Sequence, residues 1–220
     1  MKNGSSPRPS PPLGKEREKR SAAALQANYL PNSIGGSRPL SFRKGVLSDI
    51  ISVMQPLSPP DTHFLSAAAG WYELGNITEA KAELERISPA LRGHPDVLEL
   101  RWLVHAQEKN WEQGLEVAEK LVEIAPERSS GWLHRAYALR RVQRGGLQTA
   151  WDALLPAFEK FPKEPTIPYN LACYACQIGR LDEAREWLQR AVKIAGKEKI
   201  KFMALNDDDL EPLWEEIKRR

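Results

Sequence analysis

The 220-residue chain lacks the features that mark several classes of protein. It contains no run of 18 or more apolar residues, so we expect no membrane-spanning helix. Its basic N-terminus is not followed by an apolar segment, and a secretory signal is therefore not indicated. Two cysteines are too few for a disulfide framework, which makes a reducing cytoplasm the expected location.

Sequence motifs that carry catalysis are also missing. The chain has no G-x-S-x-G elbow, phosphate-binding loop, H-E-x-x-H sequence or glycine-rich dinucleotide turn. Acidic neighbours such as Glu215 and Glu216 are expected on solvated helix faces, close to Lys or Arg. We therefore predict a protein that is not an enzyme, with no catalytic residue and no cofactor.

Two short stretches have the composition of metal sites without the spacing. Cys173 and Cys176 form a C-x-x-C pair, but a structural zinc needs two more ligands and the four histidines stand singly. The pair also lacks the strand and the helix N-terminus of a thioredoxin-like redox site. The acidic run 206–209 lacks the alternating ligands and central glycine of a calcium loop. The sequence therefore predicts packing for the cysteines, helix capping for Asp207 or Asp209, and no metal.

Positive charge is concentrated at the N-terminus. Residues 1–45 hold nine Lys or Arg and two acids, whereas the rest of the chain has slightly more acids than bases. This segment is rich in Pro, Ser and Gly, so we expect a disordered leader, or a start assigned upstream of a true one at Met54. A basic leader can bind nucleic acid, which is one alternative function. Residues 46–60 follow, and "VLSDIISVM" (46–54) has the pattern of a short amphipathic helix that packs on the next segment.

From Asp61 onward the sequence repeats. A small residue recurs at a nearly constant interval, and apolar residues follow it at steps of four and three, which traces one face of a helix. A second apolar-periodic stretch precedes each turn, so each unit is predicted to be helix–turn–helix. The small residues are Ala80, Gly114, Ala150 and Ala184. The predicted units are 61–94, 95–128, 129–164 and 165–198, followed by a C-terminal cap at 199–220.

The repeat length, about 34 residues, resembles that of the tetratricopeptide repeat (TPR). The segment "YNLACYACQIGRLDEAREWLQRAV" (169–192) is similar to the last unit of bacterial TPR proteins, and "MALNDDDLEPLWEEI" (203–217) resembles the segment that often closes such arrays. The resemblance implies an all-α fold: a right-handed α-solenoid of about four units with a C-terminal capping helix and a protein-binding concave face. It does not imply a particular ligand. The seven tryptophans, Trp71 among them, are expected to pack between helices.

By analogy with TPR proteins, the first helix of each unit lines the concave face. The Lys/Asn/Arg set that clamps a chaperone's C-terminal carboxylate is absent, because those places hold residues such as Leu65 and Ser130. An aromatic and polar groove remains, suited to an extended or helical peptide with acidic and apolar residues. The alternatives are a groove that is only solvated, or one filled by the chain's own N-terminal segment. The residues predicted to bind are Tyr72, Tyr137, Arg140, Arg141, Tyr169 and Gln177.

Two arginines depart from the repeat pattern. Arg101 and Arg135 stand one unit apart, at a place where the first helix usually carries a packing Leu. One interpretation is structural: the aliphatic stems cover the interface and the guanidinium groups pair with an acid on an adjacent helix. The other is an anion site, since guanidinium groups bind carboxylate or phosphate.

The predicted function is that of a protein–protein interaction scaffold or adaptor, cytoplasmic and of bacterial type. Its partner is a protein or peptide whose identity the sequence does not give. The alternatives are self-association, through the groove or the open face of the first unit, and nucleic-acid binding through the leader.

Overall fold

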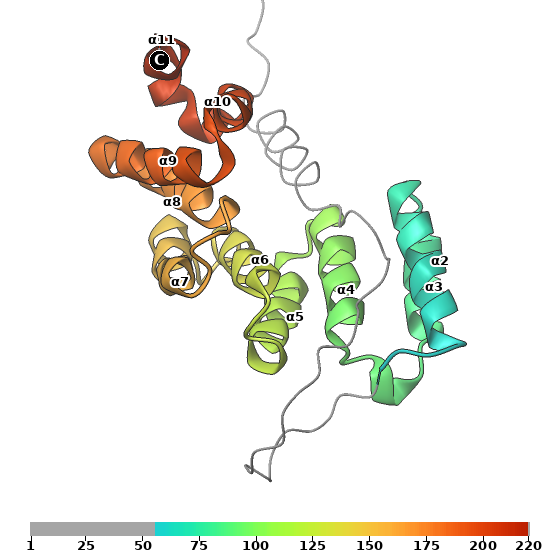
Figure 1. Ribbon diagram of the computed structural model, residues 1–220. Coiled ribbons are helices and arrows are strands. Elements are labelled where there is room, and N and C mark those ends of the chain that lie inside the picture. The colour runs from blue at the N-terminus through green and yellow to red at the C-terminus, as the bar shows by residue number, and fades with distance from the viewer. Residues whose placement is uncertain (1–55, 220) are drawn as a thin grey trace, which may run out of the picture.

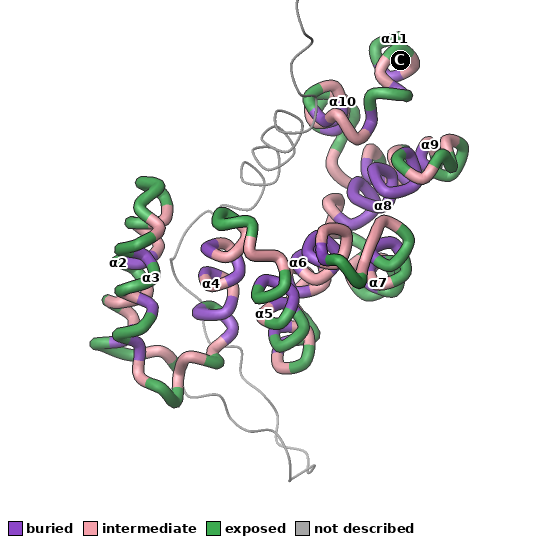
Figure 2. The backbone as a smooth tube through the Cα atoms, turned by 180° about the vertical axis from the view of Figure 1, so that it is seen from behind, coloured by how far each residue is buried: buried purple, intermediate pink, exposed green. Residues whose placement is uncertain are grey.

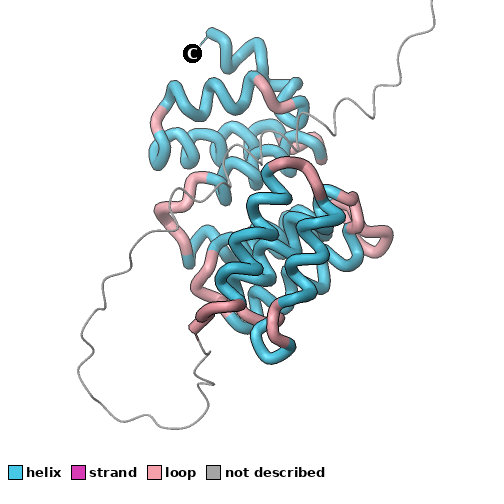
Figure 3. Tube along the Cα trace, turned by 90° about the vertical axis from the view of Figure 1, so that its right-hand side faces the viewer, coloured by secondary structure: helices cyan, strands magenta, loops and turns pink. Residues whose placement is uncertain are grey.

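The computed structural model describes residues 56–219, and every regular element in that range is a helix (Figures 1 and 3). Short turns join the helices into an α-solenoid that runs from α2 at one end to α11 at the other (Figure 1). The predicted leader (1–45) and the predicted helix at 46–54 lie outside the described residues. None of the helices in the described range is long and apolar enough to cross a membrane. The α-helices are α2 (Asp61–Glu73), α3 (Ile77–Arg86), α4 (Pro95–Gln107), α5 (Trp111–Ile124), α6 (Ser129–Leu139), α7 (Leu147–Lys160), α8 (Thr166–Gln177), α9 (Leu181–Ala195), α10 (Lys197–Leu205) and α11 (Trp214–Arg219), and the 3₁₀ helices are η1 (Pro89–Leu91) and η2 (Asp208–Leu213).

Small residues determine how closely the helices of a pair approach. Ala80, Ala150 and Ala184 have no exposed surface, and Gly114 is buried at the equivalent place in α5. A Cβ atom on Gly114 would already lie 3.8 Å from the Trp102 indole, in van der Waals contact. A large side chain at these places would separate the helices, so the small residues permit the close approach. Figure 2 shows the buried residues on the sides of the helices that face their neighbours.

The turns between paired helices repeat with the same period. Gly75, Lys109 and Gly179 occupy equivalent positions and all have positive φ, at 76°, 58° and 84°. The third turn contains the two extra residues, and there Gly146 has a φ of 127°. Its neighbour Gly145 lies so close to the preceding helix that a Cβ atom would be 1.8 Å from the Leu139 carbonyl oxygen. Because Gly145 and Gly146 have no Cβ atom, the backbone of this turn can pack closely against the preceding helix and accommodate the two extra residues.

The C-terminal cap consists of α10, η2 and α11, which cover α8 and α9. Leu210, Leu213 and Ile217 of the cap are buried in one apolar cluster that extends from α6 to α11. The indole of Trp214 donates a hydrogen bond to the Ala204 carbonyl oxygen at 2.8 Å. These residues of the cap therefore pack onto the last repeat. Helices α2, α3 and α4 share a separate and smaller cluster.

Trp71 corrects one packing prediction. Trp102, Trp151 and Trp187 are buried between helices as expected, but 38% of Trp71 is exposed. Trp71 lies on α2, the first helix of the array, and no helix precedes α2 among residues 56–219. Within residues 56–219, the side of α2 that carries Trp71 therefore has no preceding helix to pack against.

Candidate functional site: the predicted concave face

The three predicted groove tyrosines differ in burial along the array, and Gln177, at the end of α8, is exposed. Tyr72 on α2 is half-buried, whereas Tyr137 on α6 and Tyr169 on α8 are only 6% and 4% exposed. Arg140 and Arg141 follow α6 directly and are half-buried. The two ends of the predicted groove therefore differ: the end at α2 is more open than the end at α8.

The chain itself covers the end at α8. After α10 it turns back, and Asp207 to Leu213 lie against α8. The Arg140 guanidinium makes two hydrogen bonds with the Asp209 carboxylate, of which Nη2 to Oδ1 is 2.9 Å. Gln177 donates from Nε2 to the Asp209 carbonyl oxygen at 2.8 Å. Residues 207–213, here called the acidic segment, thus occupy this end of the face.

A buried polar cluster anchors the start of the acidic segment. The Tyr169 hydroxyl donates to Asp207 Oδ2 at 3.0 Å, and the Cys173 thiol lies 3.5 Å from the same oxygen. The other carboxylate oxygen of Asp207 accepts from the Asp209 amide at 3.0 Å, which caps η2. The predicted capping by Asp207 is confirmed, and the same side chain also satisfies the two donors on α8.

The electrostatics of this cluster follow from its burial. Burial raises the pKa values of Tyr169 and Cys173 well above their ordinary range, and the negative charge of Asp207 adds to both effects. Burial, reinforced by the charge of Asp209, also raises the pKa of Asp207. Burial alone would lower the pKa of Arg140, but its hydrogen bonds with Asp209 and the charge of that group raise it instead. Arg140 therefore stays charged and compensates the acids around it.

Cys173, Asp207 and Asp209 bring potential metal ligands within 4.8 Å of one another, but their surroundings do not fit a metal site. The Asp209 carboxylate already binds a cation, the guanidinium of Arg140. The Cys173 thiol has a raised pKa, whereas a metal-binding cysteine needs a thiolate in a positively charged environment. Cys176 is also buried, with its pKa raised by burial to about 11. The C-x-x-C pair is part of the core, as predicted.

The middle of the predicted groove is an aromatic cluster. Tyr137 contacts Trp102 and Trp111 edge to face, with ring centroids 5.9 and 5.7 Å apart. The Arg141 guanidinium lies 3.5 Å from the Tyr137 ring centroid and donates from Nη1 to the Tyr137 carbonyl oxygen at 2.9 Å. The structure therefore brings Tyr137 and Arg141 together, while Arg140, Tyr169 and Gln177 hold the acidic segment. Tyr72 lies apart, on α2.

Arg101 and Arg135 bridge neighbouring helices. Arg101 pairs with Glu85 at 2.8 Å and donates to the Leu84 carbonyl oxygen at the end of α3, at 3.3 Å. Arg135 donates from Nη2 to the Ala153 carbonyl oxygen of α7 at 2.9 Å. These contacts support the structural interpretation of the two arginines: an ion pair for Arg101 and a backbone hydrogen bond for Arg135.

One buried histidine, His134, has no signal in the sequence that marks it. His134 stacks on Trp102, with ring centroids 3.7 Å apart, and its Nε2 lies 3.5 Å from Glu99 Oε2. Burial lowers the pKa of His134. Burial would raise the pKa of Glu99, but hydrogen bonds from His134 and Ser130 lower it below its ordinary value. Because Glu99 and His134 come from different units, only knowledge of the helix contacts reveals the pair.

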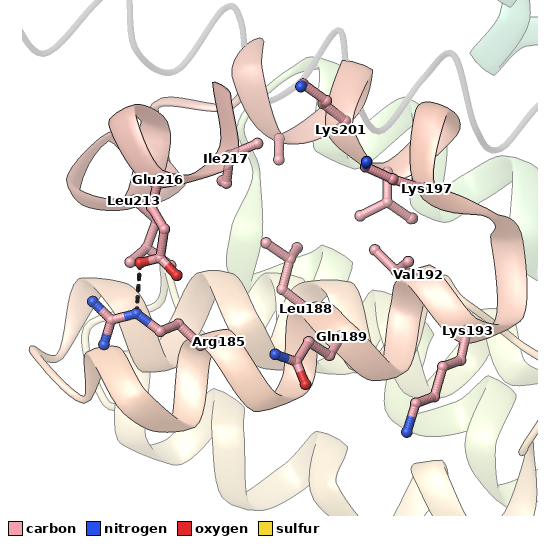
Figure 4. Close-up of a pocket in the computed structure, with 12 residues that line it drawn as sticks. Arg185, Leu188, Gln189, Val192, Lys193, Lys197, Lys201, Leu213, Glu216 and Ile217 are labelled. Atoms are coloured by element: carbon pink, nitrogen blue, oxygen red, sulfur yellow. Dashed lines mark hydrogen bonds and ion pairs between the residues drawn. The ribbon is translucent and has the colours of Figure 1, made fainter. Parts of the chain in front are cut away.

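A separate apolar pocket of about 280 Å³ lies at the C-terminal end of the array (Figure 4). Helices α9, α10 and α11 form its walls, with basic residues around the opening. The Arg185 side chain bonds Glu216 at 2.7 Å and closes one end of it (Figure 4). We call it the C-terminal pocket. Its apolar lining is Leu188, Val192, Ile200, Ala204, Leu213 and Ile217.

Comparison with known proteins identifies the fold. No protein-family model and no curated protein sequence matches the chain. Among solved structures, residues 41 to the end of MamA from Desulfovibrio magneticus RS-1 align with a TM-score of 0.56 and 15% identity, covering 74% of this chain and 94% of that one. TTC0263, a thermophilic TPR protein in Thermus thermophilus, aligns with a TM-score of 0.53 and 17% identity, covering 73% and 96%. At these identities the similarity shows the fold alone, and that fold is of the TPR type.

Proposed function

Because the chain has a TPR-type fold, we propose that it is a non-enzymatic scaffold that binds a segment of a partner protein on its concave face. The segment would be extended or helical, with acidic and apolar residues. The part of the face between Tyr72 on α2 and Arg141 after α6 would receive it. The end at α8 is already filled by the acidic segment.

One observation carries this proposal: the acidic segment itself. It is a stretch of acidic and apolar residues held by Arg140, Tyr169 and Gln177, three of the residues that the sequence marked as ligand-binding. The predicted groove therefore has the chemistry to bind such a segment, since its arginine and its phenol find acidic partners there. The described helices are packed against one another, so a partner would meet a preformed surface and binding would order little of this chain.

Affinity capture with the full chain tests the proposal. Tyr72→Ala combined with Leu103→Ala removes two half-buried side chains, from α2 and α4, that the predicted concave face shares. We expect the retained partner to fall by about tenfold or more, because apolar anchors dominate such interfaces. The variants are first matched to the wild type by helicity and melting temperature.

The control is Val117→Ala, which shortens a half-buried side chain on α5, outside the first helices of the units. This variant should retain the partner at the wild-type level. Equal retention by the control and by the Tyr72/Leu103 variant would rule out this part of the concave face as the binding surface.

A further inference from the structure

The face of α4 that holds the preceding unit is well defined. Arg101 pairs with Glu85 of α3 at 2.8 Å, and Glu108 accepts from Lys81 of α3 at 3.0 Å. Between them, Val104 is buried in the apolar cluster that α4 shares with α3. Helix α4 therefore stacks on α3 through a central apolar contact flanked by two ion pairs.

Among the described residues, no helix covers the equivalent face of α2. Ala67, Gly70 and Leu74 stand one repeat before the α4 residues that make these contacts. Trp71 and Leu74 are 38% and 77% exposed, and a Cβ atom on Gly70 would meet nothing within 4 Å. Glu73, next to Leu74, is exposed. Ala67, Gly70, Trp71 and Leu74 are together called the α2 face.

At the other end of the array, α9 has a side equivalent to the side of α3 that holds α4. The C-terminal pocket lies on the part of that side that the cap leaves uncovered. Arg185, Leu188 and Gln189 of α9 occupy the repeat positions of the α3 residues that hold α4. Helices α10 and α11 cover part of this side of α9, and the pocket of about 280 Å³ remains between the three helices (Figure 4). Terminal repeats of solenoids expose surfaces that would otherwise contact a next unit.

The charged residues beside the two surfaces differ in sign: Glu73 stands beside the α2 face, whereas Lys193 and Lys197 belong to the lining of the C-terminal pocket. Lys193 and Lys197 stand at the rim of the C-terminal pocket, are exposed, and have no acidic partner within residues 56–219. The third rim lysine, Lys201, donates to the Lys218 carbonyl oxygen at 3.1 Å. If Leu74 entered the C-terminal pocket, the carboxylate of the adjacent Glu73 would come close to these lysine amines.

We propose that the C-terminal pocket receives the α2 face of a second copy of this chain. Trp71 and Leu74 of one copy enter the apolar pocket of the next, and Glu73 faces Lys193 and Lys197. Each copy has one of each surface at opposite ends of the array, so the contact is heterologous and the assembly grows head to tail. The small contact area makes the association weak and dependent on concentration. The contact uses the ends of the array and does not rest on the function proposed for the concave face.

Sedimentation equilibrium of the full chain, from micromolar to near-millimolar concentration, tests this self-association. We expect the average mass to rise with concentration beyond that of a dimer. Trp71→Ser with Leu74→Ser removes the α2 face, and Lys193→Glu with Lys197→Glu reverses the pocket charge. Each exposed pair leaves the core unchanged, and each variant alone should associate about tenfold or more weakly than the wild type. A wild type that stays monomeric throughout overturns the proposal.

Mixing the two variants is the sharper test. The first keeps its pocket and the second keeps its α2 face, so an equimolar mixture has one intact contact and should form a one-to-one dimer that grows no further. Adding Glu73→Lys to the Lys193/Lys197 variant should restore its association. Variants that oligomerise like the wild type, or a mixture that stays monomeric while the wild type associates, would place the contact on another surface.

Thiol labelling distinguishes a second copy from the chain's own upstream residues as occupant of the α2 face. Both native cysteines are buried with raised pKa values, so Leu74→Cys supplies the accessible thiol. Labelling should be fast in dilute solution and should slow as the protein concentration rises. Slow labelling that does not depend on concentration would assign the face to the same chain and overturn the proposal.

Discussion

Arg140 and Asp209 lie 69 residues apart in the sequence and form a bidentate ion pair that holds the acidic segment on α8. Both side chains are largely buried, at 18% and 14% exposure. A guanidinium in this position needs a charged partner, because removing one member of a buried pair leaves the other without compensation. The pair therefore links the cap to the third repeat.

Asp209→Asn should lower the free energy of unfolding by about 2 kcal/mol, since the amide keeps the shape of the carboxylate but not its charge. Asp208→Asn is the matched control, because Asp208 is the neighbouring acid and makes no ion pair in the described range. Urea unfolding monitored by circular dichroism measures both. Equal stabilities of the two variants would show that the Arg140 pair contributes nothing.

His134 predicts a pH dependence of stability. Its pKa is lowered by burial, so between pH 6.5 and its folded pKa the unfolded chain binds a proton that the folded chain excludes. The titration of His134 therefore leaves the free energy of unfolding unchanged above pH 6.5. As the pH falls further, it lowers that free energy by at most about 1.4 kcal/mol per pH unit. His94 and His105 have pKa values lowered by burial and act in the same direction.

Unfolding of His134→Gln between pH 7.5 and 5.5 checks this. The variant should lose less stability over that range than the wild type, because it removes the group whose pKa burial lowers. A His134→Gln profile parallel to the wild type would show that this side chain is protonated as readily in the folded as in the unfolded chain.

At the scale of the helices, two glycines have opposite roles. Gly145 abuts the Leu139 carbonyl oxygen, whereas Gly70 lies within α2 with open space around it. Gly145→Ala should cost about 2 kcal/mol or more, since the backbone must move to admit a Cβ atom. Gly70→Ala should stabilise the chain by about 0.5–1 kcal/mol through helix propensity. Thermal unfolding of both variants in dilute solution measures the difference, and a Gly145→Ala variant as stable as the wild type would contradict the close contact.

The elements themselves were predictable because their signals are local. A nearly constant repeat length with a small residue in each unit predicts paired helices, and Ala80, Ala150 and Ala184 are buried where the pattern requires. The turn residues follow the same period, except that Lys109 stands where glycine would be expected and still adopts positive φ.

The state of the predicted groove was not predictable in the same way. Repeat analogy placed Tyr169 and Arg140 on a face, but no local pattern indicates that Asp207 and Asp209 return to that face from beyond α10. The same acids had a sufficient local explanation as helix caps, which is also correct for Asp207. Trp71 was misjudged because repeat analogy assumes a preceding unit, and α2 has none in the described range.

At the scale of the whole molecule, the acidic segment covers one part of the predicted concave face. The cap fills the α8 end with an acidic segment, and the α2–α4 end has half-buried apolar residues such as Tyr72 and Leu103. The proposed partner segment would bind beside the acidic segment, on a surface that packing holds in place. The ends of the array are available for the proposed head-to-tail contact.

Site-specific photo-crosslinking tests the central claim most directly. A photoreactive side chain in place of Leu103 samples the part of the predicted concave face between Tyr72 and Arg141, and one in place of Glu116 samples an exposed position on α5. Irradiation of the full chain with its captured partner should yield a crosslink from position 103 and none from position 116. A partner that crosslinks from position 116 and not from 103 would contradict the account and place binding on the outer helices.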